Sequence, residues 1–76
     1  MNSVVFVGIC REVTAISITL ESETGKLFQM FFASKQDPKS LELNILTKIE
    51  GYIDIREFPF PIVIVEKVYQ IKKEIN

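Results

Sequence analysis

The feature that most constrains this chain is a two-residue alternation of apolar and polar side chains, rich in β-branched residues. Isoleucine and valine account for 18 of the 76 residues. Ile16, Ile18 and Leu20 alternate with serine, threonine and glutamate, which gives a strand one buried and one solvated face. Because branched side chains pack well on a pleated surface, this pattern favours strands over helices. We therefore expect a mostly β protein.

Residues typical of turns divide the pattern into five segments. Gly25 lies in SETGK, where glycine allows the positive φ of a tight turn, and Pro38 lies in the polar stretch KQDPKS. Gly8, inside the first segment, predicts a bulge or a bend. The sequence predicts strands over residues 3–13, 14–22, 26–34, 52–58 and 62–72.

The alternation also predicts which side chains point inward. In the third strand Phe31 should face outward, because its neighbours Met30 and Phe32 take the inward face together with Phe28. In the fourth strand we expect Ile53 and Ile55 to point toward the core. Tyr52 should then point outward, with its hydroxyl in water.

Between the third and fourth predicted strands, the apolar residues recur at a different spacing. Leu41, Ile45 and Ile49 recur at helical spacing, with Ser40 as a candidate N-cap and Gly51 past the end, so we expect a short helix over 40–51. Three strands, a helix and two strands is the order of a five-stranded Greek-key barrel of the oligonucleotide-binding (OB) type. We therefore predict an all-β OB-fold barrel with one short helix. The alternative is a small SH3-like barrel, which usually has no helix at this place.

Composition narrows the class of protein. Seventy-six residues allow one domain, spanning 1–76, and a core this small favours help from a partner or from a second copy. The net charge of −1 provides no basic surplus of the kind that a dedicated nucleic-acid binder uses. One cysteine without any histidine makes neither a zinc site nor a Cys–His nucleophile pair, so we expect no cofactor. Cys10 is predicted to be a small buried hydrophobe.

The expected location follows from three further features of the sequence. Its apolar runs are far shorter than the ~20 residues that span a bilayer. The opening MNSVVFVG has neither the basic region nor the cleavage site of a signal peptide. With one cysteine there is no disulfide framework. We expect a cytoplasmic protein that does not associate with a membrane.

Three stretches carry a resemblance to a known family. The opening follows an M-N-x-V-x-x-x-G pattern, TKIEGYIDI is similar to a lysine–glycine turn followed by V-x-V, and VIVEKVYQI resembles a closing strand. Together they resemble the bacterial single-stranded DNA-binding proteins and their small primosomal relatives. That family commonly uses tryptophan and several basic residues to bind DNA, and this chain is slightly acidic and has no tryptophan. The resemblance therefore implies a weak single-strand binder or an accessory module of a replication complex.

Binding a single strand requires aromatic platforms for the bases and cations along the backbone. Each candidate has a simpler reading: Phe31 could be covered by the helix or a second subunit, Tyr52 could be a bare surface residue, and the cations could serve solubility. Arg56 could instead form a salt bridge beside Asp54. The candidates for binding nucleic acid or a partner are Phe31, Tyr52, Phe60, Lys26, Lys35, Arg11 and Arg56.

The stretch REFPFPIVIV connects the last two strands through two prolines. Proline fixes its own φ and biases the preceding residue toward an extended conformation, so the segment should be stiff. Phe58 and Phe60 either close the end of the barrel or form an outer apolar contact. We expect Phe58 to pack down at the end of its strand and Phe60 to stay partly exposed for a partner.

Two classes of function remain, and neither is enzymatic. The sequence has no histidine, no Gly-rich phosphate loop and no nucleophile elbow, so we expect no catalysis. In the first class the protein binds single-stranded DNA weakly, or together with a partner, in DNA replication or maintenance. In the second it is a non-catalytic, protein-binding accessory subunit of a primase, polymerase or helicase assembly, for which small size and the family resemblance suggest a plasmid or other mobile element.

Overall fold

The computed structural model describes residues 2–55 and 60–71. Five strands and a single turn of 3₁₀-helix, η1, make up its regular structure. In chain order these elements are β1 (Ser3–Val13), β2 (Ser17–Glu21), β3 (Leu27–Phe32), η1 (Pro38–Ser40), β4 (Leu46–Asp54) and β5 (Ile62–Gln70).

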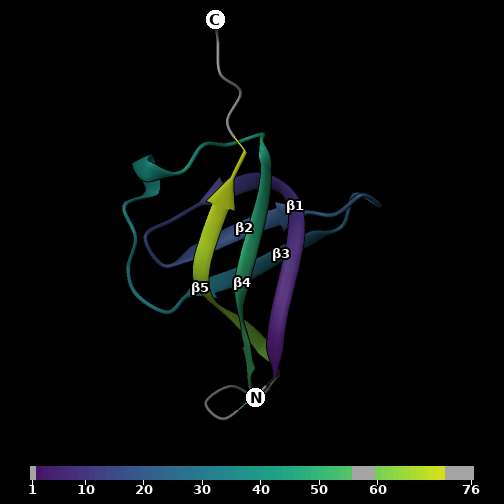
Figure 1. The fold of residues 1–76 in the computed structure, drawn as a ribbon, viewed down its shortest axis with the longest axis vertical. Coiled ribbons are helices and arrows are strands. Elements are labelled where there is room, and N and C mark those ends of the chain that lie inside the picture. The colour runs from purple at the N-terminus through teal and green to yellow at the C-terminus, as the bar shows by residue number, and fades with distance from the viewer. Residues whose placement is uncertain (1, 56–59, 72–76) are drawn as a thin grey trace, which may run out of the picture.

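The strands form a closed barrel in the order β1-β2-β3-β5-β4, in which β1 also pairs with β4. All neighbouring strands are antiparallel except β3 and β5, which run parallel. In Figure 1, β1, β4 and β5 form the near wall, and the β2–β3 hairpin crosses behind them. This confirms the predicted all-β architecture, a five-stranded barrel of OB type.

The core is small and lies along the barrel axis. Its most buried side chains come from all five strands, and the partly buried Phe6, Phe32 and Val63 pack against them. Cys10 is fully buried, as predicted, and burial raises the pKa of its thiol above the usual value. The buried members of this cluster are Cys10, Ile18, Leu20, Met30, Ile49 and Val65.

The predicted helix over 40–51 is wrong. Only Pro38–Ser40 makes a 3₁₀ turn, capped by the side chain of Asp37, and the chain then enters β4 at Leu46. Thr47 and Ile49 are buried and separated by an exposed residue, which is strand periodicity. A spacing of four residues, which suggested the helix, is also a multiple of the strand period.

Residues 46–54 form a strand because they pair with a neighbouring strand on each side. Ile49 pairs with Phe6 of β1 and with Val68 of β5, so β4 is a central strand of the near wall. Asn44, with a positive φ of 67°, turns the chain immediately before it. Asparagine tolerates this left-handed conformation better than most residues do.

Other boundaries differ from the prediction by a few residues. β1 spans the predicted residues, whereas β2 begins at Ser17 because the hydroxyl of Thr14 accepts hydrogen bonds from the amides of Ile16 and Ser17. The bulge of β1 is at Arg11, where the register with β2 shifts, and not at Gly8. Gly8 instead permits a close crossing of strands, since a Cβ there would lie 2.6 Å from the carbonyl oxygen of Glu21.

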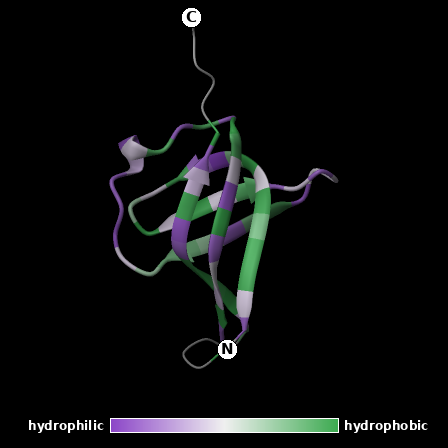
Figure 2. Ribbon diagram, viewed as in Figure 1, coloured by the Kyte–Doolittle hydropathy of each residue, from purple (hydrophilic) through white to green (hydrophobic). Residues whose placement is uncertain are grey.

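The predicted inward faces are confirmed for Met30 and Phe32 in β3, but not for Phe28 or for Ile53 and Ile55 in β4. Met30 is buried and Phe32 packs against the core, although Phe28 is partly exposed and its ring lies 4.9 Å from that of Phe6. Ile53 and Ile55 are exposed, because the buried part of β4 ends before them. Alternating hydropathy along β4 and β5 is visible in Figure 2. No helix within residues 2–55 and 60–71 is long and apolar enough to cross a membrane.

Candidate binding face on strands β3, β5 and β4

A row of apolar side chains crosses the outer wall of the barrel on three neighbouring strands. Phe31 of β3 pairs with Ile64 of β5, and Ile64 pairs with Tyr52 of β4. Paired residues of adjacent strands stand on the same face of a sheet. Because Phe32 and Val65, one position further on, belong to the core, this row faces outward. Phe31 and Tyr52, two strands apart, are separated by about 10 Å at the backbone.

A groove lies along β3 beside this row, and we refer to it as the β3 groove. It encloses about 400 Å³ and brings Phe31 together with Phe60, which the sequence places 29 positions apart. Leu27 and Phe60 line it and are 63% and 62% exposed. Its lining comprises Phe6, Leu27, Phe28, Gln29, Met30, Phe31, Phe60, Pro61, Ile62 and Val63.

The lining combines aromatic rings with few polar groups. Phe6 and Phe28, tilted by 55° to one another, line the groove alongside the exposed Phe60. Gln29 is the one polar side chain among its described lining residues, and the Gln29 amide lies 3.5 Å from the hydroxyl of Ser17 on β2. A surface of this kind can stack against planar apolar rings, and it offers hydrogen bonds at one place.

Two lysines flank β3, one at each end. Lys26 directly precedes the strand, and Lys35 follows it by three residues. The backbone around Lys35 is anchored, because the amide of Ala33 donates to Val65 and the amide of Gln36 donates to Ala15. Among the described residues neither lysine has an ion-pair partner. Their charges are therefore available to an anion lying along β3.

Arg11 is not part of this face. Its side chain forms an ion pair with Glu21 at 2.8 Å and donates a second hydrogen bond to the side-chain oxygen of Asn44, also at 2.8 Å. These contacts occupy the guanidinium and balance its charge. Arg56 and Phe58, also singled out by the sequence, lie outside the described residues.

Sequence reasoning missed Ile64 and the two phenylalanines beneath the groove. Ile64 lies in the run IVIV, where both faces of the strand are apolar. Such a run indicates that the outward face also has a role, and that signal could have identified Ile64. Phe6 and Phe28 carry no comparable signal, because their shared position depends on the crossing of β1 over β3.

Comparison with known proteins gives no further guide to function. No family model, no curated protein and no solved structure matches this chain. The likeness to bacterial single-stranded DNA-binding proteins therefore stays a prediction from the sequence. The fold and the geometry of this face are the observations on which a function has to rest.

Proposed function

We propose that the protein binds single-stranded nucleic acid weakly through the β3 groove and the neighbouring row of Phe31, Ile64 and Tyr52, and that it acts in DNA replication or maintenance. The observation that carries this proposal is the meeting of Phe31, Tyr52 and Phe60 on one face with a lysine at either end of β3. Bases stack on such aromatic rings, and lysines follow the phosphates. OB barrels bind oligonucleotides on the face of strands two and three and on adjoining loops, and the proposed face shares with that region β3 and the segment before β5 that carries Phe60.

The second candidate is a non-catalytic, protein-binding accessory role in a replication assembly. Two observations favour it: the net charge of −1, and the large exposed side chains of Leu27 and Phe60 on a mostly apolar groove. A subunit that helps a catalytic partner to hold DNA would fulfil both roles.

A titration with fluorescent oligo-dT tests the first proposal. We expect saturable binding with a dissociation constant in the micromolar range or weaker, and a clear loss of affinity in Phe31→Ala and Phe60→Ala. Tyr69→Ala is the matched control, because Tyr69 is an exposed aromatic near the C-terminal end of β5, five residues beyond Ile64, where it contacts Lys48 and Glu50. If Phe31→Ala and Phe60→Ala both bind oligo-dT as tightly as the wild type, the binding face is assigned wrongly. If oligo-dT does not bind at all, only the accessory role remains.

A further inference from the structure

The N-terminal half of β1 has a strand neighbour on one side only. β1 pairs with β4 from Ser3 to Ile9, but its pairing with β2 begins only at Ile9. Among the described residues, Ser3 to Gly8 therefore have an open edge on the side away from β4. In Figure 1 this half of β1 forms the right-hand margin of the near wall, below the point where the β2–β3 hairpin crosses it.

The backbone groups on this edge can be identified from the ladder with β4. The carbonyl of Asn2 accepts from Ile53, and the amide of Cys10 donates to Ile45, so the even-numbered residues of β1 face β4. In an antiparallel ladder alternate residues direct their amide and carbonyl groups to opposite sides. Ser3, Val5 and Val7 therefore direct theirs toward the open edge, and no described residue pairs with them.

The side chains on this edge are uncharged and, apart from Ser3, apolar. Val5 and Val7 are 61% and 52% exposed, and no charged residue or proline occurs in positions 2–9. Natural proteins usually protect an exposed edge with lysine, proline or a bulge. None of these devices lies between Ser3 and Gly8, and the bulge of β1 comes only at Arg11.

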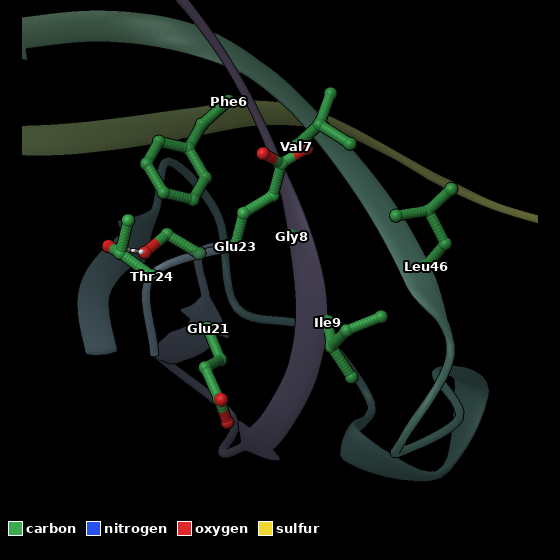
Figure 3. A pocket seen from close by; sticks show the side chains of 9 residues that line it. Phe6, Val7, Gly8, Ile9, Glu21, Glu23, Thr24 and Leu46 are labelled. Atoms are coloured by element: carbon green, nitrogen blue, oxygen red, sulfur yellow. Dashed lines mark hydrogen bonds between the residues drawn. The ribbon is translucent and has the colours of Figure 1, made fainter. Parts of the chain in front are cut away.

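A hollow of about 420 Å³ adjoins the upper end of the edge. Figure 3 shows Glu23 reaching from the hairpin toward β1 near Val7. The carboxylate of Glu21 is paired with Arg11, whereas Glu23 has no cation partner among the described residues. The hollow is lined by Phe6, Val7, Gly8, Ile9, Glu21, Ser22, Glu23, Thr24 and Leu46.

We propose that this edge binds an extended segment of a partner protein as an added β-strand, with a lysine or arginine of that segment beside Glu23. The added strand would bond to the amides and carbonyls of Ser3, Val5 and Val7, as in other cases of strand addition. Five edge residues span about 17 Å, which matches a partner segment of about five residues. Alternate apolar side chains of the segment would cover Val5 and Val7.

A partner segment fits this edge better than a second copy of the chain does. If two copies paired through Ser3–Val7, each Glu23 would meet an uncharged strand, since positions 2–9 contain no cation. A foreign segment can supply the missing positive charge. The inference rests on the edge and not on the proposed nucleic-acid binding. Of the described residues, Phe6 alone lines both this hollow and the β3 groove, so the tests leave it unchanged.

The test is selection from a displayed library of random peptides about ten residues long, roughly twice the span of the edge. The strongest peptide is then synthesised, with its basic residue kept or replaced by glutamate. We expect selected peptides to alternate apolar and polar residues and to carry lysine or arginine near one end. The basic version should bind roughly two- to fivefold more tightly than the acidic one, the size expected of an exposed ion pair. Bound peptide should slow hydrogen exchange at the amides of Val5 and Val7.

Four variants distinguish peptide binding at the β1 edge from binding at the β3 groove and from dimerisation. Glu23→Lys should reverse the charge preference, Glu42→Lys should keep it as the matched control, Val5→Lys should abolish binding, and Phe31→Ala should leave it intact. Because Val5 and Glu23 are exposed, their variants should melt like the wild type. The proposal is overturned if the Val5 and Val7 amides stay unprotected or if Glu23→Lys leaves the preference unchanged. It is also overturned if sedimentation shows a dimer that Val5→Lys dissociates while no peptide is selected.

Discussion

Phe31 and Met30 are adjacent residues of β3 with opposite environments. Met30 is 2% exposed in the core, whereas the half-buried Phe31 stands on the outer row beside Ile64. The alternation of the sequence was sufficient to predict this, because a strand presents successive side chains to opposite faces. A shift of one residue would have exchanged the two roles.

The adjacent pair gives a matched test of the binding face. Phe31→Ala should weaken oligo-dT binding by ~1 to 3 kcal/mol, the value of one stacking aromatic. Met30→Ala should instead destabilise the fold by ~2 to 5 kcal/mol, because it leaves a cavity in the core. Urea melts and oligo-dT titrations of both variants measure the two effects. A Phe31→Ala protein that loses as much stability as Met30→Ala would show that Phe31 is a core residue.

Cys10 gives a prediction about pH. Burial raises the pKa of its thiol in the folded state, whereas the unfolded chain has the ordinary value of ~8.5. Folding therefore favours the protonated thiol. This contribution to stability is complete below about pH 8.5 and is lost as the pH rises through the folded-state pKa. Above about pH 8.5 the wild type should lose stability faster than Cys10→Ala, as measured by urea melts across that range. Equal losses of stability in the wild type and in Cys10→Ala would contradict this prediction.

Among the candidate residues, the sequence could indicate the aromatic ones but not the state of the cations. Phe31 and Tyr52 follow from the strand period, and the position of Phe60 between two prolines suggested its exposure. The pairing of Arg11 with Glu21 depends on the bulge of β1 and on its register with β2. No local pattern encodes such a contact, because it forms only after two separate strands have paired.

At the scale of elements, β1 and β5 were easier to predict than the central strand β4. β1 and β5 carry continuous runs of apolar, mostly β-branched residues, and their observed bounds match the expected ones closely. The first part of β4, residues 46–51, was mistaken for a helix, because Leu41, Ile45 and Ile49 fit both periods. Pairing with strands on both sides decided its conformation, and tertiary pairing of this kind overrides local preference.

The crossing of β4 and β5 gives a prediction at this scale. The register of the two strands shifts between Glu50 and Gly51, and a Cβ on Gly51 would overlap the backbone carbonyl of Ile64. Backbone cannot move aside as a flexible side chain can, so Gly51→Ala should cost ~3 kcal/mol or more. Gly25→Ala, in an open turn at a φ of 81°, should cost only ~1 to 2 kcal/mol. Thermal melts of the two variants check this, and equal costs would mean that the close approach does not constrain the barrel.

At the scale of the whole molecule, the charge distribution predicts weak nucleic-acid binding. The chain has nine basic and ten acidic residues, so no long-range attraction draws a polyanion to it. Arg11 and Lys48 are each paired with a glutamate. At the two ends of β3, Lys26 and Lys35 are positioned to contact phosphates without losing an ion-pair partner among the described residues.

The salt dependence of binding follows from these two lysines. Each phosphate contact on a single strand contributes about −0.7 to the slope of log affinity against log salt, so two contacts predict a slope of about −1.4. Lys26→Ala and Lys35→Ala should each make the slope shallower by about 0.7. Lys39→Ala, in the η1 turn beyond the face, should leave it unchanged. Oligo-dT titrations over a series of salt concentrations provide the slopes. A slope steeper than about −4, or nanomolar affinity at about 150 mM salt, would require a cationic surface that these lysines do not provide.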